Sequence, residues 1–221
     1  MNNSKFLFTA MLVAFSTFLM AGNTFASSEV YGGDIEKGKE LAGATGCMGC
    51  HGADGNSPVP NFPKIAGLGS KYIYRQLQNV RDGNRIIASM AGLVDTYSNE
   101  QLKDLAVFYN SQKLQITGAV PLDVLVNAGI KVDSLKIGAR VYRAGNLQTN
   151  VPSCIGCHSP RGLGNEPAGY PRLGGQYPEY IAAQLRAYRD GGREHEIMNT
   201  VAKNMTNAEI DSVANFIAGL N

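Results

Sequence analysis

Apolar residues recur at helical spacing in two segments that lie far apart in the chain. The two predicted helices span residues 98–111 and 206–220, and each begins with a capping box. The boxes are formed by Ser98 with Gln101 and by Thr206 with Glu209. The apolar stripes are formed by Leu102, Leu105, Ala106 and Tyr109, and by Ile210, Val213, Ala214 and Ile217. We expect both stripes to face a hydrophobic core.

Helix start and stop signals predict two more helices in each half of the chain. In the first half, Asp34 is expected to cap a helix over 35–42, and Ser70 a helix over 71–81. In the second half, Ser134 is expected to cap a helix over 135–143. Pro178 suits the first turn of a helix that ends at Gly191. The pattern therefore predicts an all-α protein.

The two halves also repeat each other in sequence. At a shift of 108 residues, identical residues meet without a gap across more than twenty positions. They include Pro63 with Pro171, Tyr72 with Tyr180, Gln76 with Gln184, Arg81 with Arg189, Arg85 with Arg193, and Met90 with Met198. Self-similarity at a fixed shift indicates two copies of one fold. We predict domain 1 over residues 27–115, a linker with little periodicity over 116–133, and domain 2 over 134–221.

The N-terminal 26 residues have the pattern of a secretory signal peptide. Lys5 supplies the charge of the n-region, and an apolar run follows it to Ala21. Thr24-Phe25-Ala26 resembles a small-x-small cleavage site. We therefore expect export to the periplasm, with cleavage near Ala26. An uncleaved anchor is the alternative, but the run is short for a membrane span.

Each half contains one copy of the pentapeptide pattern C-x-x-C-H. The copies are Cys47-Met48-Gly49-Cys50-His51 and Cys154-Ile155-Gly156-Cys157-His158. This pattern is the attachment site of a c-type haem: the two cysteines form thioethers, and the histidine lies under the iron. The sequence therefore predicts two covalently bound haem c groups. Export agrees with this, because bacterial c-type haem is attached outside the cytoplasm.

The four cysteines have two alternative uses. Zinc bound by all four would tie together segments about a hundred residues apart and leave both adjacent histidines without a role. Two disulfides, each across two residues, would leave the same histidines unexplained. Haem attachment accounts for all four cysteines and for both histidines, so we favour it.

The organisation of each half resembles the class I cytochrome c fold, and the duplication resembles the dihaem cytochrome c4 family. The resemblance covers nearly all of residues 33–220. Besides the haem motifs, it rests on the segments Pro63-Lys64-Ile65-Ala66-Gly67 and Pro171-Arg172-Leu173-Gly174-Gly175. It implies two tandem domains, each a small helical bundle around a haem, and a chain that carries electrons rather than an enzyme.

Counting histidines and methionines narrows the choice of the second axial ligand of each iron. Two histidines on each haem would require four, and the chain has three. Met90 in the first half and Met198 at the matching place in the second are therefore the expected ligands, opposite His51 and His158. Met205 is expected to pack. His195 competes with Met198, but we interpret it as a solvated loop residue.

The resemblance also suggests which residues support the iron ligands. In class I cytochromes the proximal histidine donates its second nitrogen to a proline carbonyl, which implies Pro63 and Pro171 here. Four arginines recur in register and are candidates to pair with haem propionates: Arg81, Arg85, Arg189 and Arg193. Surface charge at a helix end explains them equally well. Tyr72, Tyr180, Gln76 and Gln184 are expected to line a haem pocket or the contact between the halves, or simply to pack.

Charge adds little about partners. The formal net charge is +2, and no basic stripe suggests nucleic acid. Similarity to cytochrome c4 suggests donation to a terminal oxidase, with another cytochrome or a quinol-oxidising complex upstream. Peripheral association with a membrane stays open.

Two rival functions remain. One is a dihaem subunit of a flavocytochrome or another dehydrogenase. The other is a dihaem peroxidase. A peroxidase needs an open position on one iron, which two methionine ligands would fill.

Overall fold

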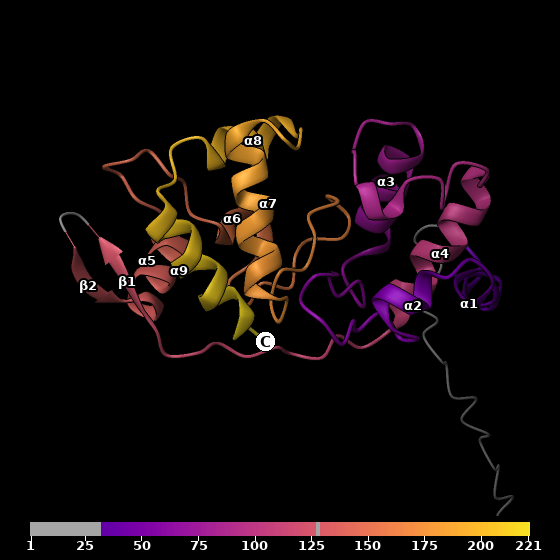
Figure 1. Cartoon of the computed structure of the whole chain (residues 1–221), viewed down its shortest axis with the longest axis horizontal. Coiled ribbons are helices and arrows are strands. Elements are labelled where there is room, and N and C mark those ends of the chain that lie inside the picture. Colours follow the sequence, from indigo (N-terminus) through magenta and orange to yellow (C-terminus); the bar gives the residue numbers. More distant parts are fainter. Residues whose placement is uncertain (1–31, 127–128) are drawn as a thin grey trace, which may run out of the picture.

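A computed structural model describes residues 32–126 and 129–221, so the predicted signal peptide lies outside the described residues. The chain forms two helical units that lie side by side, joined by an extended segment that runs along both of them (Figure 1). The first unit contains α1 (Ile35–Ala44), α2 (Cys47–His51), α3 (Ser70–Arg81), a 3-10 turn (Ala88–Met90) and α4 (Asn99–Ser111). The second contains α5 (Ser134–Ala144), α6 (Ile155–His158), α7 (Pro178–Asp190), α8 (Glu196–Ala202) and α9 (Asn207–Ala218).

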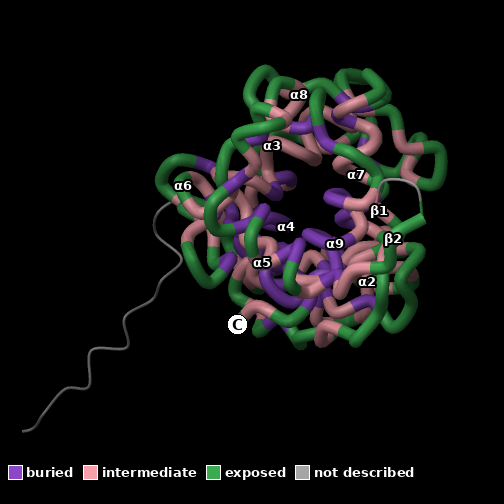
Figure 2. Tube along the Cα trace, turned by 90° about the vertical axis from the view of Figure 1, so that its left-hand side faces the viewer, coloured by how far each residue is buried: buried purple, intermediate pink, exposed green. Residues whose placement is uncertain are grey.

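The two units have equivalent cores, which confirms both predicted stripes. Leu102, Leu105 and Ala106 of α4 are buried in the first core. Ile210, Val213, Ala214 and Ile217 of α9 are buried in the second. In Figure 2 the buried positions near the α4 and α9 labels gather toward the inside of the trace. The helical fold class predicted from the sequence is confirmed.

A glycine lies where the first and last helices of each unit cross. An added Cβ at Gly38 of α1 would overlap the carbonyl oxygen of Asp104 in α4. An added Cβ at Gly138 of α5 would overlap the carbonyl oxygen of Ser212 in α9. The close approach of each helix pair therefore requires a residue without a side chain. This packing fixes the frame on which the haem motifs sit.

Most of the predicted caps are present, but two are wrong. Both capping boxes form, and the Asp34 side chain accepts hydrogen bonds from the first turn of α1. However, Ser70 and Ser134 lie inside α3 and α5, one residue past the position expected for a cap. Asp133 caps α5 instead, and the N-cap residue of α3 is Gly69, which has no side chain to cap with. The Ser70 hydroxyl is used in a tertiary contact, donating to Glu166 of the other unit.

The segment predicted to be a linker contains a hairpin that the sequence pattern did not indicate. Strands β1 (Asp123–Val126) and β2 (Ile130–Asp133) pair antiparallel, with Val124 opposite Val132. These valines, together with Val126, pack against the second core. Two strands of four residues are too short for their alternation to stand out. Residues upstream also belong to the second unit, because the Gly118 amide donates to the Ala218 carbonyl oxygen at 2.9 Å.

Within residues 32–126 and 129–221, no helix is both long enough and apolar enough to cross a membrane.

Candidate functional site

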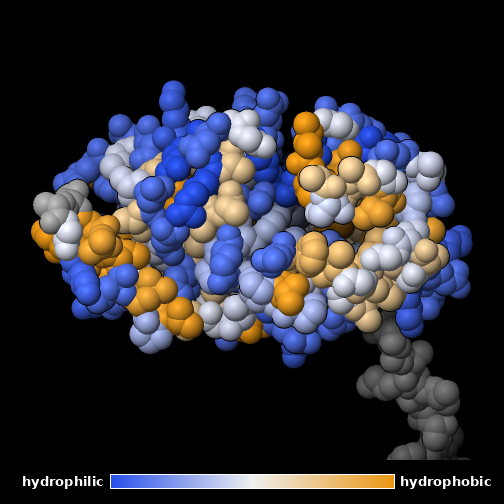
Figure 3. Space-filling model, in the orientation of Figure 1, coloured by the Kyte–Doolittle hydropathy of each residue, from blue (hydrophilic) through white to orange (hydrophobic). Residues whose placement is uncertain are grey.

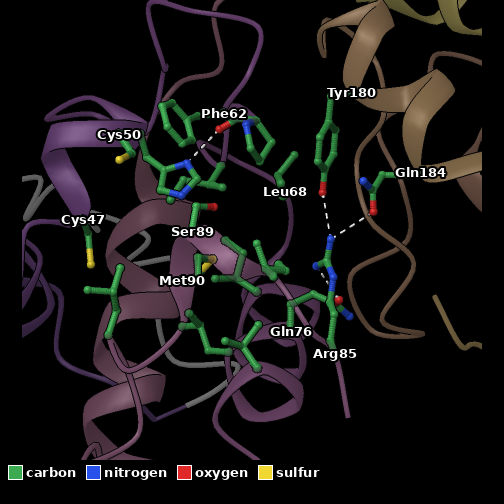
Figure 4. A pocket seen from close by; sticks show the side chains of 18 of the residues that line it. Cys47, Cys50, Phe62, Leu68, Gln76, Arg85, Ser89, Met90, Tyr180 and Gln184 are labelled. Atoms are coloured by element: carbon green, nitrogen blue, oxygen red, sulfur yellow. Dashed lines mark hydrogen bonds between the residues drawn. The ribbon is translucent and has the colours of Figure 1, made fainter. Parts of the chain in front are cut away.

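The first candidate site is a cavity of about 560 Å³ lined by Cys47, Cys50, His51 and Met90. The cysteines and the histidine come from α2, and Met90 ends the 3-10 turn that follows α3. Figure 4 shows the side chains of Cys47, Cys50 and Met90 arranged around this space. Residues far apart in sequence therefore bring two thiols, an imidazole and a thioether to one cavity.

His51 is held in one orientation. Its Nδ1 lies 2.9 Å from the carbonyl oxygen of Pro63. A carbonyl only accepts hydrogen bonds, so Nδ1 carries the proton and Nε2 keeps its lone pair. Burial lowers the pKa of His51, while the bond to Pro63 acts to raise it. The ring is thus a neutral imidazole with its free nitrogen available to a metal.

The second cavity repeats the donor set in a smaller space of about 130 Å³. Cys154, Cys157, His158 and Met198 line it. The Nδ1 atom of His158 lies 3.0 Å from the carbonyl oxygen of Pro171. Burial lowers the pKa of His158 and raises the pKa of Cys154 to about 12, so this thiol is protonated at neutral pH.

The short helices of the haem motifs end in the same unusual way. Gly52 follows His51 with a φ of 79°, and Ser159 follows His158 with a φ of 67°. A side chain at such an angle is strained, and Ser159 is held there by two contacts. The Ser159 hydroxyl accepts from the Leu163 amide at 2.9 Å, and its carbonyl oxygen accepts from the Tyr142 hydroxyl at 2.7 Å.

Met198 lies in α8, a short helix that the sequence pattern did not predict. His195, expected to be solvated, is half-buried and caps that helix, its Nδ1 accepting from the Met198 amide at 3.4 Å. Burial, then the charges of Arg75 and Arg193, lower the pKa of His195. His195 also lines the second cavity. Met205, expected to pack, is buried in the second core.

The four repeated arginines fall into two pairs. Arg81 and Arg189 lie in the last turns of α3 and α7, where each bonds the carboxylate of the next residue, Asp82 or Asp190. Neither appears among the residues that line the two cavities. Arg85 and Arg193 instead lie between the two units, and both line the first cavity. The arginines thus have two different roles, which the sequence repeat alone did not separate.

Arg85 and Arg193 form a symmetric network with side chains of both units. Arg85 donates to Gln76 Oε1 at 2.8 Å and to Gln184 Oε1 at 3.0 Å. Arg193 donates to the same two oxygens, at 2.7 Å and 2.6 Å. Each also reaches a tyrosine hydroxyl of the opposite unit, Tyr180 for Arg85 and Tyr72 for Arg193. The close-up shows Arg85 extended toward Tyr180 and Gln184 (Figure 4).

The charge of this network is not balanced by protein groups. Arg193 is only 8% exposed, and among the residues that the structure describes no carboxylate pairs with either guanidinium. A buried cation beside a second cation is costly unless an anion accompanies them. The network therefore suits a ligand that carries carboxylates.

The residues present fit a covalently attached haem. Each cavity offers two thiols, a neutral imidazole and a thioether, together with apolar walls, and the arginine network offers cations for propionates. The larger cavity has the volume of an ordinary cofactor pocket.

A zinc site made of all four cysteines does not fit the structure. The cysteines lie two in each cavity rather than together. Over the ranges 32–126 and 129–221, no group of three or more His, Cys, Asp or Glu residues is placed to hold a metal ion.

Comparisons with known proteins point in one direction. The sequence model of the family described as Cytochrome c matches residues 35–113 and 135–221. Cytochrome c4 of Pseudomonas aeruginosa is 38% identical over 85% of this chain and 89% of that protein. The thiosulfate dehydrogenase electron acceptor of Thiomonas intermedia is 35% identical over 79% of this chain and 78% of its own length. The crystal structure of reduced cytochrome c4 from Pseudomonas stutzeri superposes with a TM-score of 0.78, at 38% identity, over 86% of this chain and all of that one.

Proposed function

Because this chain belongs to the cytochrome c family and, within it, to the dihaem cytochrome c4 group, we propose that it is a periplasmic carrier that relays electrons through both of its haems. Electron transfer with two covalent haem c groups follows from the family. The route, the iron ligands and the partners are our proposal. When bound, each haem supplies a one-electron iron couple.

We assign the roles of the residues from the two donor sets. Cys47 and Cys50 hold the first haem, and Cys154 and Cys157 the second. His51 and Met90 are the proposed ligands of the first iron. His158 and Met198 are those of the second. With these residues as its ligands, each iron would have no free position for a substrate, which supports a carrier rather than a peroxidase.

The proposed relay rests on one observation: the two cavities share part of their walls. Tyr72, Tyr180, Gln184 and Arg193 line both of them. Two haems in these cavities would be separated by a few side chains only. An electron that enters at one haem can therefore leave from the other.

The proposed propionate contacts predict different effects for the two arginine pairs. Replacing Arg85 with glutamine removes a cation beside the first cavity, which favours ferric iron. We expect the potential of the first haem to fall by about 59 mV, a roughly tenfold change for a one-electron couple. Spectroelectrochemistry of the holoprotein measures this. Arg81→Gln is the matched control outside the cavities, and an equal fall there would contradict the assignment.

The rim of the first cavity is a suitable place for a redox partner to dock. Ile86 is 89% exposed and Leu93 is 44% exposed, and both line the cavity. Apolar surface also borders a hollow in this unit in the space-filling view (Figure 3). Burial of such a rim brings a partner close to the haem edge without requiring a large interface.

A terminal haem–copper oxidase is the proposed acceptor, with another cytochrome or a quinol-oxidising complex upstream. The test mixes the reduced holoprotein with a purified oxidase in air and follows both haems optically. We expect oxidation at rates comparable to oxidase turnover. Oxidation no faster than in buffer alone would contradict this acceptor.

The relative from Thiomonas intermedia favours a second candidate, acceptance of electrons from a thiosulfate-oxidising enzyme. This second candidate concerns only the electron donor, so it is compatible with the same relay between the two haems. When thiosulfate dehydrogenase and thiosulfate are added to the oxidised holoprotein, both of its haems should become reduced if this donor is correct. Omission of thiosulfate is the control.

Export of the chain is supported by the pattern of residues 1–26. A chain expressed with this segment should appear in the periplasmic fraction with both haems attached. A chain that lacks it should stay in the cytoplasm without covalent haem.

A further inference from the structure

The peptides that hold the two proximal histidines are both bonded from the opposite unit. The Pro63 carbonyl oxygen accepts from His51, and the N–H of the same peptide, on Lys64, donates to Gln176 Oε1 at 3.0 Å. In the second unit, the Pro171 carbonyl oxygen accepts from His158. The N–H of that peptide, on Arg172, donates to the Leu68 carbonyl oxygen at 3.2 Å. Each histidine is thus two hydrogen bonds away from the other unit.

These contacts follow the sequence repeat but differ chemically. Gln176 falls on Leu68 at the shift of 108 residues. At residue 68 the main chain makes the contact, whereas at residue 176 a side chain makes it. Gln176 also donates its amide N–H to the Lys64 carbonyl oxygen at 2.7 Å, so it bonds Lys64 on both sides. The Lys64 main chain thus makes two hydrogen bonds with Gln176, one donated and one accepted, whereas the Arg172 N–H donates a single bond to the Leu68 carbonyl oxygen.

The Gln176 contact is built into the protein interior. Gln176 is 2% exposed and Lys64 is 5% exposed. The Gln176 oxygen also accepts from the Tyr177 amide at 3.0 Å, which fixes its orientation. A buried amide with its polar atoms bonded in this way has one stable position.

We propose that Gln176 is a positioning residue for the first haem: by polarising the Pro63–Lys64 peptide it strengthens the bond from His51 and lowers the potential of that haem alone. An acceptor on the N–H side of a peptide makes its carbonyl oxygen a better acceptor. A stronger bond from the histidine makes the ring more basic, which stabilises ferric iron. The inference rests on the proposed role of His51 as the iron ligand.

Gln176 therefore makes the first haem depend on how the second unit is docked. A partner that shifts the two units against each other would alter this bond and, with it, the potential of the first haem. The second haem, bonded through a main-chain oxygen at a longer distance, is expected to respond less.

The test compares three variants of the holoprotein. Gln176→Leu installs the residue of the equivalent position and removes both bonds to Lys64. Gln176→Glu keeps an oxygen that can accept from the Lys64 N–H. Tyr177→Phe is the matched control: it removes another contact between the units, from the Tyr177 hydroxyl to the Ser57 carbonyl oxygen at 2.6 Å, without touching the peptide. Spectroelectrochemistry measures the potentials, and paramagnetic NMR follows each haem separately.

We expect Gln176→Leu to raise the potential of the first haem by up to about 59 mV, a roughly tenfold change in its reduction equilibrium. The second haem should not move. Gln176→Glu should leave the first potential at or below the parent value, and Tyr177→Phe should change neither haem.

Three results would overturn the inference: no shift in Gln176→Leu, an equal shift at both haems, or a rise in Gln176→Glu that matches the leucine variant. If Gln176→Leu fails to fold, the glutamate variant still decides. A mere loosening of the contact between the units predicts a rise in the first potential, whereas polarisation of the peptide, which glutamate keeps, predicts no rise. Failure of the proposed function is a separate outcome. It would appear as a missing haem, or as a missing His/Met spectrum in the parent protein.

Discussion

Replacing Met198 with alanine is expected to abolish the far-red sulfur-to-iron charge-transfer band of the second haem and to lower its potential. The band requires a bond between sulfur and iron. The neutral thioether favours ferrous iron, so its loss stabilises the ferric state. Axial ligands together span about 0.8 V in haem proteins, so the fall should be on the order of 0.1 V or more. Optical spectra and a redox titration of the purified variant measure both effects.

His195 is the competing ligand in this test, because it lines the same cavity and caps the helix that carries Met198. His195→Ala removes the cap but leaves the sulfur, so the band should remain. Met205→Leu keeps the volume of a buried side chain in the same core and should also retain the band. If His195→Ala removes the band while Met198→Ala leaves it, the ligand is misassigned.

Replacing Gly38 with alanine is expected to destabilise the first unit by more than about 3 kcal/mol, at or beyond the upper end of ordinary overpacking. The added Cβ would overlap the Asp104 carbonyl oxygen, and main chain cannot move aside as a side chain can. Domains of this size are stable by only about 5–15 kcal/mol, so a large share of the margin would be lost. Denaturant unfolding of the holoprotein, followed by circular dichroism, measures the change.

Gly43 offers a matched control on the same helix. Its added Cβ would meet only the Met48 side chain at 3.9 Å, which is ordinary contact. Gly43→Ala should therefore be neutral or stabilise the protein by up to about 1 kcal/mol through helix propensity. Equal losses in both variants would show that the crossing at Gly38 is not as tight as the structure indicates.

The sequence predicted the helices and the haem motifs because their signals are local. The capping boxes at Ser98 and Thr206 and the apolar stripes behind them need only neighbouring residues to be recognised. Ser70 shows where local signals fail. Its hydroxyl is bonded to Glu166, which lies in the other unit, so a tertiary contact displaced the expected cap.

The contact between the units was the least predictable part of the site. Tyr72 and Gln76 were expected to line a haem pocket, to join the halves or simply to pack; in the structure they line the first cavity and also bond to Arg193 of the other unit. The bond from Lys64 to Gln176 joins residues that no local pattern connects. The available signal was Gln176, a polar residue at the position where the first repeat has Leu68. Its contact can be recognised only when the two units are placed together.

A redox titration of the native holoprotein, followed by optical spectra, tests the two-haem relay most directly. Two haems with methionine ligands on both irons predict two one-electron steps. The far-red sulfur-to-iron band should be present in the fully oxidised protein and fall in both steps. A single haem per chain, or a high-spin iron with an open axial position in either step, would contradict the relay.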